Sequence, residues 1–339
     1  MTTFVLAGSG FRGKTLLRVS SSVPDLHCVG VVGRAPGPLS RRLADFPRPA
    51  FVVTALPRAV TPSFVAEAVA LGLPVLAETP PAPDLAGLRA LWAAAGSSGL
   101  VQVAEQYLLM PTHAARLAAV RSGIIGTPTQ VQVSSTQQYH AVSLIRGLLG
   151  AGHAPASVRA VRFVAPLLDP LDRSGWVDSP AVAPATTTIA TVDFGGGRSG
   201  VYDFTSNQTR NQLRFRRLLV RGSRGELRDD ELIHLAAPRT IVRVPLVRAA
   251  GVISLGDRVL YRNPYPGRPL NDDEIATATL LSAMADWVRG SGPPPYPLAE
   301  GLRDQAIAPA IEEAADTGRE VVTTPEAWND RASSQDTER

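Results

Sequence analysis

Cysteine and long hydrophobic runs are scarce in this sequence, and each shortage excludes a class of protein. The 339 residues contain one cysteine, Cys28, which can form neither an internal disulfide bond nor a thiolate metal cage. We expect Cys28 to pack in a core and the protein to lie in a reducing cytoplasm. No apolar run reaches the ~18 residues of a transmembrane helix, and the N-terminus lacks the basic segment of a secretion signal. The sequence therefore predicts a cytoplasmic protein with no membrane partner.

Lysine is scarcer still, because Lys14 is the only one in the chain. The 34 basic residues are therefore nearly all arginines, and with 30 acidic residues they give a formal net charge of +4. The arginines are spread along the chain with acidic residues between them, so we expect a solvated surface and no nucleic-acid partner. The sequence has no H-E-x-x-H motif and no thiolate cluster, so we expect no metal site.

The length predicts about two domains, at ~100–200 residues per domain. Residues 1–112 alternate short apolar runs with helical patterns, which indicates a parallel sheet covered by helices on both faces. Helices are expected at 64–70 and 85–95. Five apolar runs are expected as its strands: 4–7, 28–32, 51–53, 74–77 and 100–103.

The pattern changes in the second part of the chain, residues 113–330. Longer segments alternate polar with apolar residues, which indicates an antiparallel sheet with one solvated or subunit-facing side. The expected strands are 130–134, 158–164, 187–194, 199–205 and 213–220, and the expected helices are 112–122, 272–289 and 301–317. The polar tail, 331–339, is expected to be disordered.

A glycine loop follows the first predicted strand and opens a helix. Its sequence, Gly8-Ser9-Gly10-Phe11-Arg12-Gly13, fits the dinucleotide fingerprint G-x-G-x-x-G. In that fingerprint Gly8 makes the tight turn, Gly10 lets the backbone approach a pyrophosphate, and Gly13 lets helix and strand pack closely. The six residues are therefore predicted to bind the cofactor; the alternative is a glycine turn without a ligand.

The same segment also fits the phosphate loop G-x-x-x-x-G-K-[ST] of nucleoside triphosphatases, through Gly8, Gly13, Lys14 and Thr15. Such an enzyme also needs an acidic residue at the end of an apolar strand to hold Mg²⁺. Glu78 is the only acidic residue found at such a position. We therefore favour a dinucleotide-binding loop and keep the triphosphatase as the alternative.

The end of the second strand indicates whether the loop binds NAD or NADP. The strand ends Val31-Val32-Gly33-Arg34, without the acidic residue that would bind the ribose 2′-hydroxyl of NAD. Arg34, followed by Arg41 and Arg42, could bind a 2′-phosphate instead. We therefore predict NADP, with NAD possible; the alternative is that these arginines are only surface charges.

The order and spacing of several motifs resemble the glucose–fructose oxidoreductase and inositol dehydrogenase family (Gfo/Idh/MocA). The likeness spans nearly the whole chain and is carried by the glycine loop and by these segments: 66–80, 104–107 with Pro111, 121–126, His140 with Leu148 and Gly150, 220–226, and 317–319.

The resemblance implies an α/β protein with an N-terminal Rossmann domain, 1–112, and a C-terminal α/β domain, 113–330, with a large, mostly antiparallel sheet. The open face of that sheet often packs on another subunit, which implies a homo-oligomer, a dimer or tetramer. Family substrates are usually sugars, cyclitols or other small polar molecules. The family also lines its cofactor channel with the backbone after the third strand, here Thr54, Leu56 and Pro57.

The sequence departs from the family at the residues that act on substrate. The segment that reads Glu-Lys-Pro in the family is Glu78-Thr79-Pro80 here, so the lysine that polarises the reacting oxygen is absent. Aspartates that the family often carries around its histidine are replaced by Thr136 and Ser143. These changes leave the expected fold intact and put ordinary alcohol oxidation in doubt.

Two residues are candidates for proton transfer. His140 has a suitable intrinsic pKa and lies where the family places its acid–base histidine; the alternative is a capping or surface histidine. Tyr107 follows the fifth strand, at the edge of a parallel sheet where ligands collect, although its ring could equally be packed.

Other polar residues are expected beside these two. Glu78 and Thr79 are assigned to the cofactor, although Glu78 could instead cap a turn. Glu105, Gln138 and Tyr139 are assigned to the substrate, with an exposed polar loop as the alternative for the last two.

The sequence thus predicts an NADP-dependent oxidoreductase that exchanges hydride with a sugar-like or other small polar substrate. Two alternatives remain open: a reductase of C=N bonds, which needs only a proton donor near nitrogen, and a non-catalytic NADP-binding protein.

Overall fold

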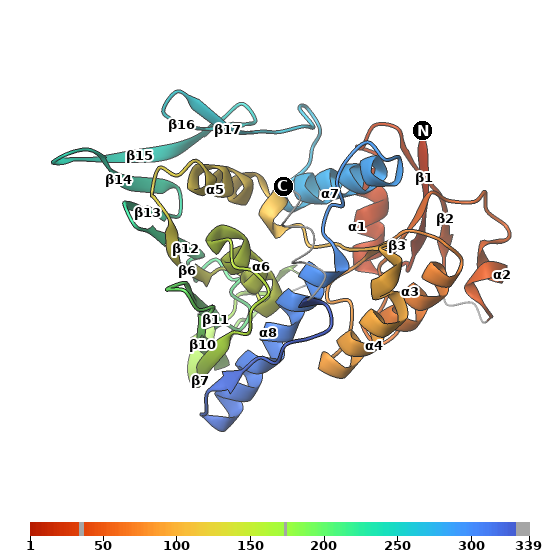
Figure 1. The fold of residues 1–339 in the computed structure, drawn as a ribbon, viewed down its shortest axis with the longest axis horizontal. Coiled ribbons are helices and arrows are strands. Elements are labelled where there is room, and N and C mark those ends of the chain that lie inside the picture. The colour runs from red at the N-terminus through yellow and green to blue at the C-terminus, as the bar shows by residue number, and fades with distance from the viewer. Residues whose placement is uncertain (34–36, 173–174, 330–339) are drawn as a thin grey trace. The chain divides into compact units, whose positions relative to one another are not determined.

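The structure, a computed structural model, describes residues 1–33, 37–172 and 175–329 (Figure 1). The chain forms two compact units. The first contains residues 1–113 and 262–303 and the described residues from Glu326 onward, and the second contains residues 114–261 and 304–325. The tail 331–339, expected to be disordered, lies outside the described residues.

The first unit is built on a five-stranded parallel sheet with the order β2-β1-β3-β4-β5. After β2 the chain crosses to the other side of β1, so the direction of winding reverses between β1 and β3. Ligands of such sheets bind outside the carboxyl ends of the strands at this reversal. The strands are β1 (Thr2–Ala7), β2 (Leu26–Val32), β3 (Phe51–Thr54), β4 (Val75–Ala77) and β5 (Val101–Val103).

Helices flank this sheet, and two of them, α4 and α7, begin at a side-chain cap. Asp84 accepts a hydrogen bond from the Gly87 amide at the start of α4, and Asn271 and Glu274 form a capping box at the start of α7. The elements are α1 (Phe11–Ser20), α2 (Leu39–Leu43), α3 (Thr61–Ala70), α4 (Leu85–Ala95), the short 3₁₀ turns η1 (Gly96–Ser98) and η2 (Tyr107–Leu109), and α7 (Asp272–Val288).

The second unit is built on an eleven-stranded, mostly antiparallel sheet with the order β17-β16-β15-β14-β13-β12-β6-β11-β10-β7-β18. Its strands are β6 (Pro128–Ser134), β7 (Ser157–Leu168), β10 (Val182–Asp193), β11 (Ser199–Thr205), β12 (Arg217–Gly222), β13 (Gly225–Arg228), β14 (Glu231–Ala237), β15 (Thr240–Ala249), β16 (Val252–Leu255), β17 (Arg258–Arg262) and β18 (Val321–Val322). A separate small hairpin pairs β8 (Leu171–Asp172) with β9 (Gly175–Trp176).

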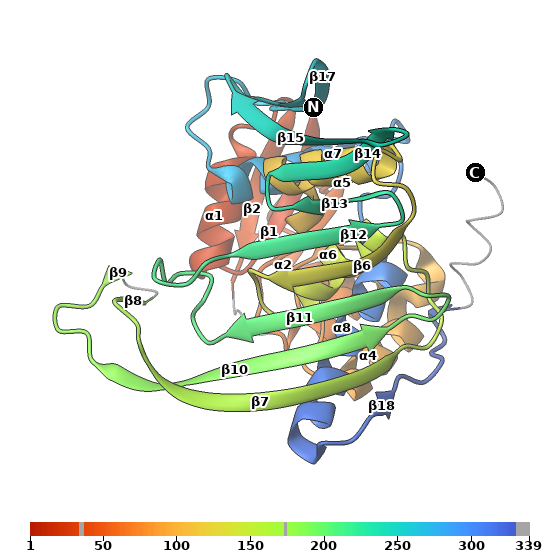
Figure 2. The same ribbon diagram turned by 90° about the vertical axis from the view of Figure 1, so that its left-hand side faces the viewer.

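One face of the large sheet is covered by helices and the other is open. Figure 2 looks onto the open face, with α5 (Pro111–Arg121), α6 (Gln138–Leu149) and α8 (Leu298–Thr317) behind it. Burial alternates along the strands, as one covered and one open face require. On β10 the buried residues are Thr188, Ala190 and Val192, and the exposed residues between them are Ile189 and Thr191. The fold class predicted from the sequence is therefore confirmed.

Two local expectations differ from the structure. The strand expected at 213–220 begins only at Arg217, because residues before it form a turn in which the Leu213 amide donates to Asn211 Oδ1 at 2.9 Å. Strands β13 to β17, residues 225–262, were not foreseen at all.

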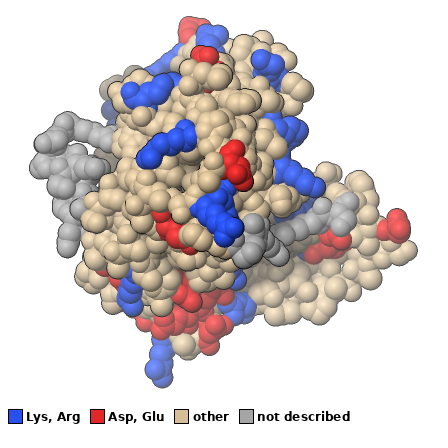
Figure 3. All heavy atoms as spheres, turned by 90° about the vertical axis from the view of Figure 1, so that its right-hand side faces the viewer, with Lys and Arg blue, Asp and Glu red and all other residues tan. Residues whose placement is uncertain are grey.

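Charged side chains of both signs are mixed on the surface. Figure 3 shows basic side chains as separate spots, with acidic ones beside them, on one face of the molecule. Within the described part of the chain, no helix combines the length and the apolar character needed to cross a membrane.

A buried ion pair joins two helices on the covered face of the large sheet. Arg146 Nη1 of α6 lies 2.6 Å from Asp304 Oδ1 of α8, and each side chain is only 4% exposed. Removing one partner of such a pair leaves a charge buried without its counterion, whereas replacing both with apolar groups avoids that cost.

We therefore predict that Asp304→Ala lowers the free energy of unfolding by about 3–5 kcal/mol, measured by urea denaturation. The double variant Arg146→Met/Asp304→Leu should recover most of this loss. Glu226→Gln, which breaks the exposed Arg221–Glu226 pair, should cost less than about 1 kcal/mol. Equal losses in Asp304→Ala and Glu226→Gln would contradict the role of the buried pair.

Candidate functional site

The glycine loop between β1 and α1 has the backbone geometry of a dinucleotide-binding turn. Gly8 has a φ of +110°, and a Cβ there would overlap the carbonyl group of Ala55. A Cβ on Gly13 would overlap the Gly8 carbonyl, whereas a Cβ on Gly10 meets nothing within 4 Å. The first and third glycines are thus required by packing, and the second leaves the backbone open to a ligand. The three positions fit the expected roles of the fingerprint.

The remaining loop residues are accessible. Ser9 is exposed, Phe11 is 89% exposed, and Arg12 is half-buried at the start of α1. The first amides of a helix have no partner inside the helix and carry partial positive charge, so this end of α1 suits a phosphate group. These residues could hold the pyrophosphate of a nicotinamide dinucleotide.

The same geometry does not favour the triphosphatase alternative. Helix α1 begins at Phe11, so only Gly8 to Gly10 separate it from β1, too few residues to wrap around a phosphate. Lys14 lies within the helix with its amide bonded to the Gly10 carbonyl, and the Thr15 hydroxyl donates to the Phe11 carbonyl at 3.2 Å. The Lys14 and Thr15 match is a coincidence of sequence that the backbone does not use.

Polar residues collect at the carboxyl ends of β3, β4 and β5, as expected. The buried Thr54 hydroxyl accepts a hydrogen bond from the Glu78 amide at 3.1 Å, which ties the ends of β3 and β4 together. After β5, Glu105 Oε1 accepts from the Tyr107 amide at 3.0 Å. Glu105 is 3% exposed, so part of its role is to shape this turn.

Other candidates near this edge are more accessible. Leu56 is half-buried and Pro57 exposed on the segment after β3, and Thr79 is half-buried beside Glu78. The Tyr107 ring is stacked with His113, with ring centroids 6.4 Å apart. The alternative of a packed Tyr107 ring thus has support in this contact.

Arg12 connects the glycine loop to this edge of the sheet. Its Nε lies 3.0 Å from Glu78 Oε2, and its Nη1 lies 3.4 Å from Asp273 Oδ2 at the start of α7. Gln106 Nε2 donates to Asp273 Oδ1 at 2.8 Å. The structure therefore brings Arg12 and Glu78, both assigned to the cofactor, into direct contact, and adds Asp273 and Gln106 to the group.

Asp273 was not among the residues chosen from the sequence. The spacing of Asn271 and Glu274 is that of a capping box and marks a helix start, so an acidic first turn at 272–274 could have been read from it. Nothing local indicates that this turn would meet Arg12, which is 261 positions away.

The region expected to choose between NAD and NADP is partly described. Arg34 lies outside the described residues. Arg42 donates to the Gly33 carbonyl at 3.5 Å, and its guanidinium group lies 5.5 Å from the centre of the Phe64 ring. Arg41 is exposed on α2. Positive charge thus lies close to the end of β2, where Gly33 carries no side chain.

His140 belongs to the second unit, in the first turn of α6. It is half-buried, its ring centroid is 4.1 Å from that of Tyr139, and its carbonyl accepts from the Ser143 hydroxyl at 2.9 Å. Position 143, where the family often has an aspartate, is thus used here as a hydrogen bond within the helix.

Gln138, two residues before His140, contacts the large sheet and α8. Its amide donates to Tyr202 Oη at 3.3 Å, and its side chain donates to Glu312 of α8. Two residues along a helix correspond to a rotation of about 200°, so Gln138 and His140 lie on nearly opposite sides of α6. The structure does not bring these two candidates together.

No family model and no curated protein matches this chain. Solved structures do. An oxidoreductase from Agrobacterium radiobacter in complex with NAD⁺, L-tartaric acid and magnesium is 17% identical, with a TM-score of 0.69 over 94% of this chain and 98% of that one. A myo-inositol dehydrogenase from Corynebacterium glutamicum is 17% identical, with a TM-score of 0.66 over 96% and 99% of the two chains.

A levoglucosan dehydrogenase in complex with NADH and levoglucosan is 19% identical, with a TM-score of 0.66 over 95% of this chain and 99% of that one. At these identities the likeness is one of fold. The fold implied by the resemblance to the glucose–fructose oxidoreductase and inositol dehydrogenase family is therefore confirmed along nearly the whole chain.

The glycine geometry predicts that stability and cofactor binding can be separated. Gly10→Ala should change the free energy of unfolding by less than about 1 kcal/mol, because the new Cβ meets no protein atom within 4 Å. It should weaken NADPH binding at least tenfold, because Cβ occupies the space for the pyrophosphate. Urea denaturation and fluorescence titration with NADPH measure the two effects.

Gly13→Ala is the control, since its Cβ overlaps the Gly8 carbonyl and should lower stability itself. Undiminished NADPH affinity in Gly10→Ala would place the cofactor away from this loop.

Proposed function

We propose that this chain is an NAD(P)-dependent oxidoreductase that prefers NADP and transfers hydride to or from a carbon of a small polar, sugar-like molecule. The observation that carries the proposal is the glycine turn, in which Gly8 and Gly13 are fixed by packing and Gly10 is open at the winding reversal of the sheet. Support also comes from proteins of the same fold whose structures hold NAD⁺ with L-tartaric acid or NADH with levoglucosan.

The preference for NADP rests on charge at the end of β2. Gly33 stands where an acidic side chain would bind the ribose hydroxyls of NAD, so nothing at that position repels a 2′-phosphate. Arg34 follows directly, and Arg42 bonds the Gly33 carbonyl. A guanidinium group can bind a phosphate through two parallel hydrogen bonds.

The nicotinamide ring supplies hydride to the substrate carbon or accepts it. The protein must then give a proton to the substrate oxygen during reduction, or take it during oxidation. We assign this proton to the imidazole of His140, with the Tyr107 phenol as the second candidate. Either side chain can exchange a proton with the substrate directly.

The fixed cation at the carboxyl edge of the first unit is Arg12. Because a guanidinium group keeps its proton, Arg12 cannot act as an acid or base. Paired with Glu78 and Asp273, it instead positions these two carboxylates beside the glycine loop.

Reduction of a C=N bond is the second candidate reaction. Thr79 stands where the resembling family has the lysine that polarises a reacting oxygen. An imine needs only a proton donor near nitrogen, which His140 or Tyr107 provides.

We further propose that the protein is a cytoplasmic homo-oligomer that pairs through the open face of the large sheet. Val161, Phe163 and Ile189 share that face by strand register and are 49%, 56% and 37% exposed. Apolar side chains clustered on an open sheet face are typical of a subunit contact.

Cofactor choice is tested by fluorescence titration with NADPH, NADH and ATP–Mg²⁺. Arg34→Ala should raise the Kd for NADPH roughly tenfold or more, the cost of losing a charged hydrogen bond, and change the Kd for NADH less than twofold. Arg48→Ala, an exposed arginine bonded to the Leu71 carbonyl, is the control and should change neither. Equal losses for both cofactors would contradict the NADP preference, and tighter binding of ATP–Mg²⁺ would contradict the proposed activity.

A substrate is first sought by screening polyols with NADP⁺, and carbonyl compounds and imines with NADPH. Proton transfer to or from that substrate is then tested with His140→Ala. The kcat should fall about 10²–10⁴-fold, the usual contribution of a general acid or base. The Kd for NADPH should stay within twofold, and His27→Ala, at an exposed position on β2, should leave kcat unchanged. If His140→Ala keeps its kcat and Tyr107→Phe loses it, the proton belongs to Tyr107.

A further inference from the structure

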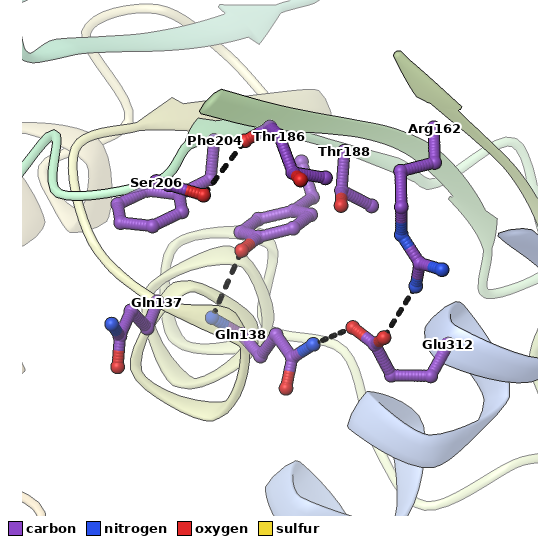
Figure 4. A pocket seen from close by; sticks show the side chains of 9 residues that line it. Gln137, Gln138, Arg162, Thr186, Thr188, Phe204, Ser206 and Glu312 are labelled. Carbon is purple, nitrogen blue, oxygen red and sulfur yellow. Dashed lines mark hydrogen bonds and ion pairs between the residues drawn. The ribbon is translucent and has the colours of Figure 1, made fainter. Parts of the chain in front are cut away.

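A hollow of about 530 Å³ lies in the second unit, on the helix-covered face of the large sheet. Its walls come from β7, β10 and β11, from the start of α6 and from α8 (Figure 4). The volume falls within the ~300–1,000 Å³ that is usual for small-molecule sites. His140 does not line it, since the α6 residues that do are Gln137 and Gln138.

Strand register explains why polar side chains meet here. On β10, Thr188 lies opposite Phe204 of β11 and Arg162 of β7, so the three side chains share one face of the sheet. Thr186, two residues earlier, points to the same face. Tyr202 reaches it from β11, opposite Ala190.

Several hydroxyl groups in this hollow are available to a ligand. Within the described residues, no hydrogen bond engages the side-chain hydroxyl of Thr186 or of Thr188, although Thr188 is only 9% exposed. The Tyr202 side chain is 2% exposed, and its oxygen accepts the Gln138 amide, which leaves its proton to donate. Burial raises the pKa of Tyr202 above its usual value, so this group stays a neutral donor. The two threonine hydroxyls line the hollow, so they can bind water or a polar molecule that takes its place.

The arginine of the hollow is already paired with acidic side chains. Arg162 bonds both Glu312 and Asp316 of α8, and Gln138 donates to Glu312 (Figure 4). The single guanidinium group is therefore opposed by two carboxylates, which leaves no cation for an anionic ligand. Among the described residues, no cluster of three or more His, Cys, Asp or Glu side chains could hold a metal ion.

These features select the chemistry of the ligand. An apolar molecule would take water away from the threonine hydroxyls without replacing its hydrogen bonds. An anion would meet Glu312 and Asp316. Hydroxyls and amides that both donate and accept match a ligand whose own hydroxyls do the same.

We propose that this hollow binds a neutral polyhydroxylated molecule of about monosaccharide size, at a place separate from the side of α6 that carries His140. The site goes beyond the proposed hydride transfer, because it involves neither the glycine loop nor His140.

The test uses a thiol placed at the rim. Ser206 is exposed beside the hollow, where its hydroxyl donates to the Thr186 carbonyl at 3.1 Å, so Ser206→Cys is a small change. Ser63→Cys is the control, since Ser63 is exposed on α3 of the first unit and its hydroxyl also donates to a backbone carbonyl, that of Val60. Cys28 adds little background, because burial raises the pKa of its thiol and lowers its reactivity.

Alkylation by iodoacetamide is followed without nicotinamide cofactor, with myo-inositol, D-glucose or D-gluconate present. We expect myo-inositol or glucose at about 100 mM to slow alkylation of Ser206→Cys at least threefold, as a Kd of about 50 mM or less requires, and to leave Ser63→Cys unchanged. Gluconate should protect less. No protection by either neutral compound, equal slowing at both positions, or stronger protection by gluconate would overturn the proposal.

A second variant measures the hydroxyl contribution directly. In the Ser206→Cys background, Thr188→Val removes one hydroxyl with little change of shape and should raise the half-protecting concentration about fivefold, the worth of one hydrogen bond. Thr191→Val, on the opposite face, should not change it. An unchanged value in Thr188→Val would overturn the proposal even if hydride transfer were established, because this assay needs no cofactor.

Discussion

The turn after β1 packs so closely on the end of β3 that neither Gly8 nor Gly13 can carry a side chain. This constraint fixes the start of α1 directly beyond the carboxyl end of β1, at the place where the winding of the sheet reverses. It also leaves Gly10 facing open space, with the first amides of α1 beside it. A helix start held in this way is organised before any ligand arrives, so a phosphate need not order it. The cofactor assignment and the proposed reaction both depend on this packing.

The start of α7 supplies the acidic side chains that face α1. Asp273 contacts Arg12, and Glu274 pairs with Arg18, six residues further along α1. Arg12 is thereby held between Glu78 and Asp273. A long arginine side chain fixed by two carboxylates loses little further entropy when it meets a ligand. The first unit is therefore completed by a segment far from it in sequence, which helps to fix Arg12 at the edge where the cofactor is expected.

The sequence predicted the first unit better than the second, and the reason lies in burial. Strands such as 51–53 are covered on both faces, so they read as apolar runs with glycine or proline nearby. Strands β13 to β16 are joined by tight turns in which Asp229, Arg239 and Ala250 adopt positive φ. Because positive φ is uncommon for residues other than glycine, these residues do not predict a turn from the sequence. The turn at Asp229 is instead held from outside: Arg116 of α5 donates to the Asp229 carbonyl at 2.7 Å and pairs with Asp230. A turn stabilised by a distant helix has no local signature.

The candidate residues on α6 show the same limit at a finer scale. Gln138 and His140 were grouped because they are neighbours in sequence, yet a helix turns neighbours to different sides. Gln138 is drawn toward the sheet by the Tyr202 oxygen and by Glu312, and both partners belong to elements that follow α6 by more than 50 residues. Once Gln138 bonds these partners, the first turn of α6 is fixed in rotation, and the direction of His140 follows from it. The polar hollow thus accounts for the direction of Gln138, while His140 lies on the other side of the same helix.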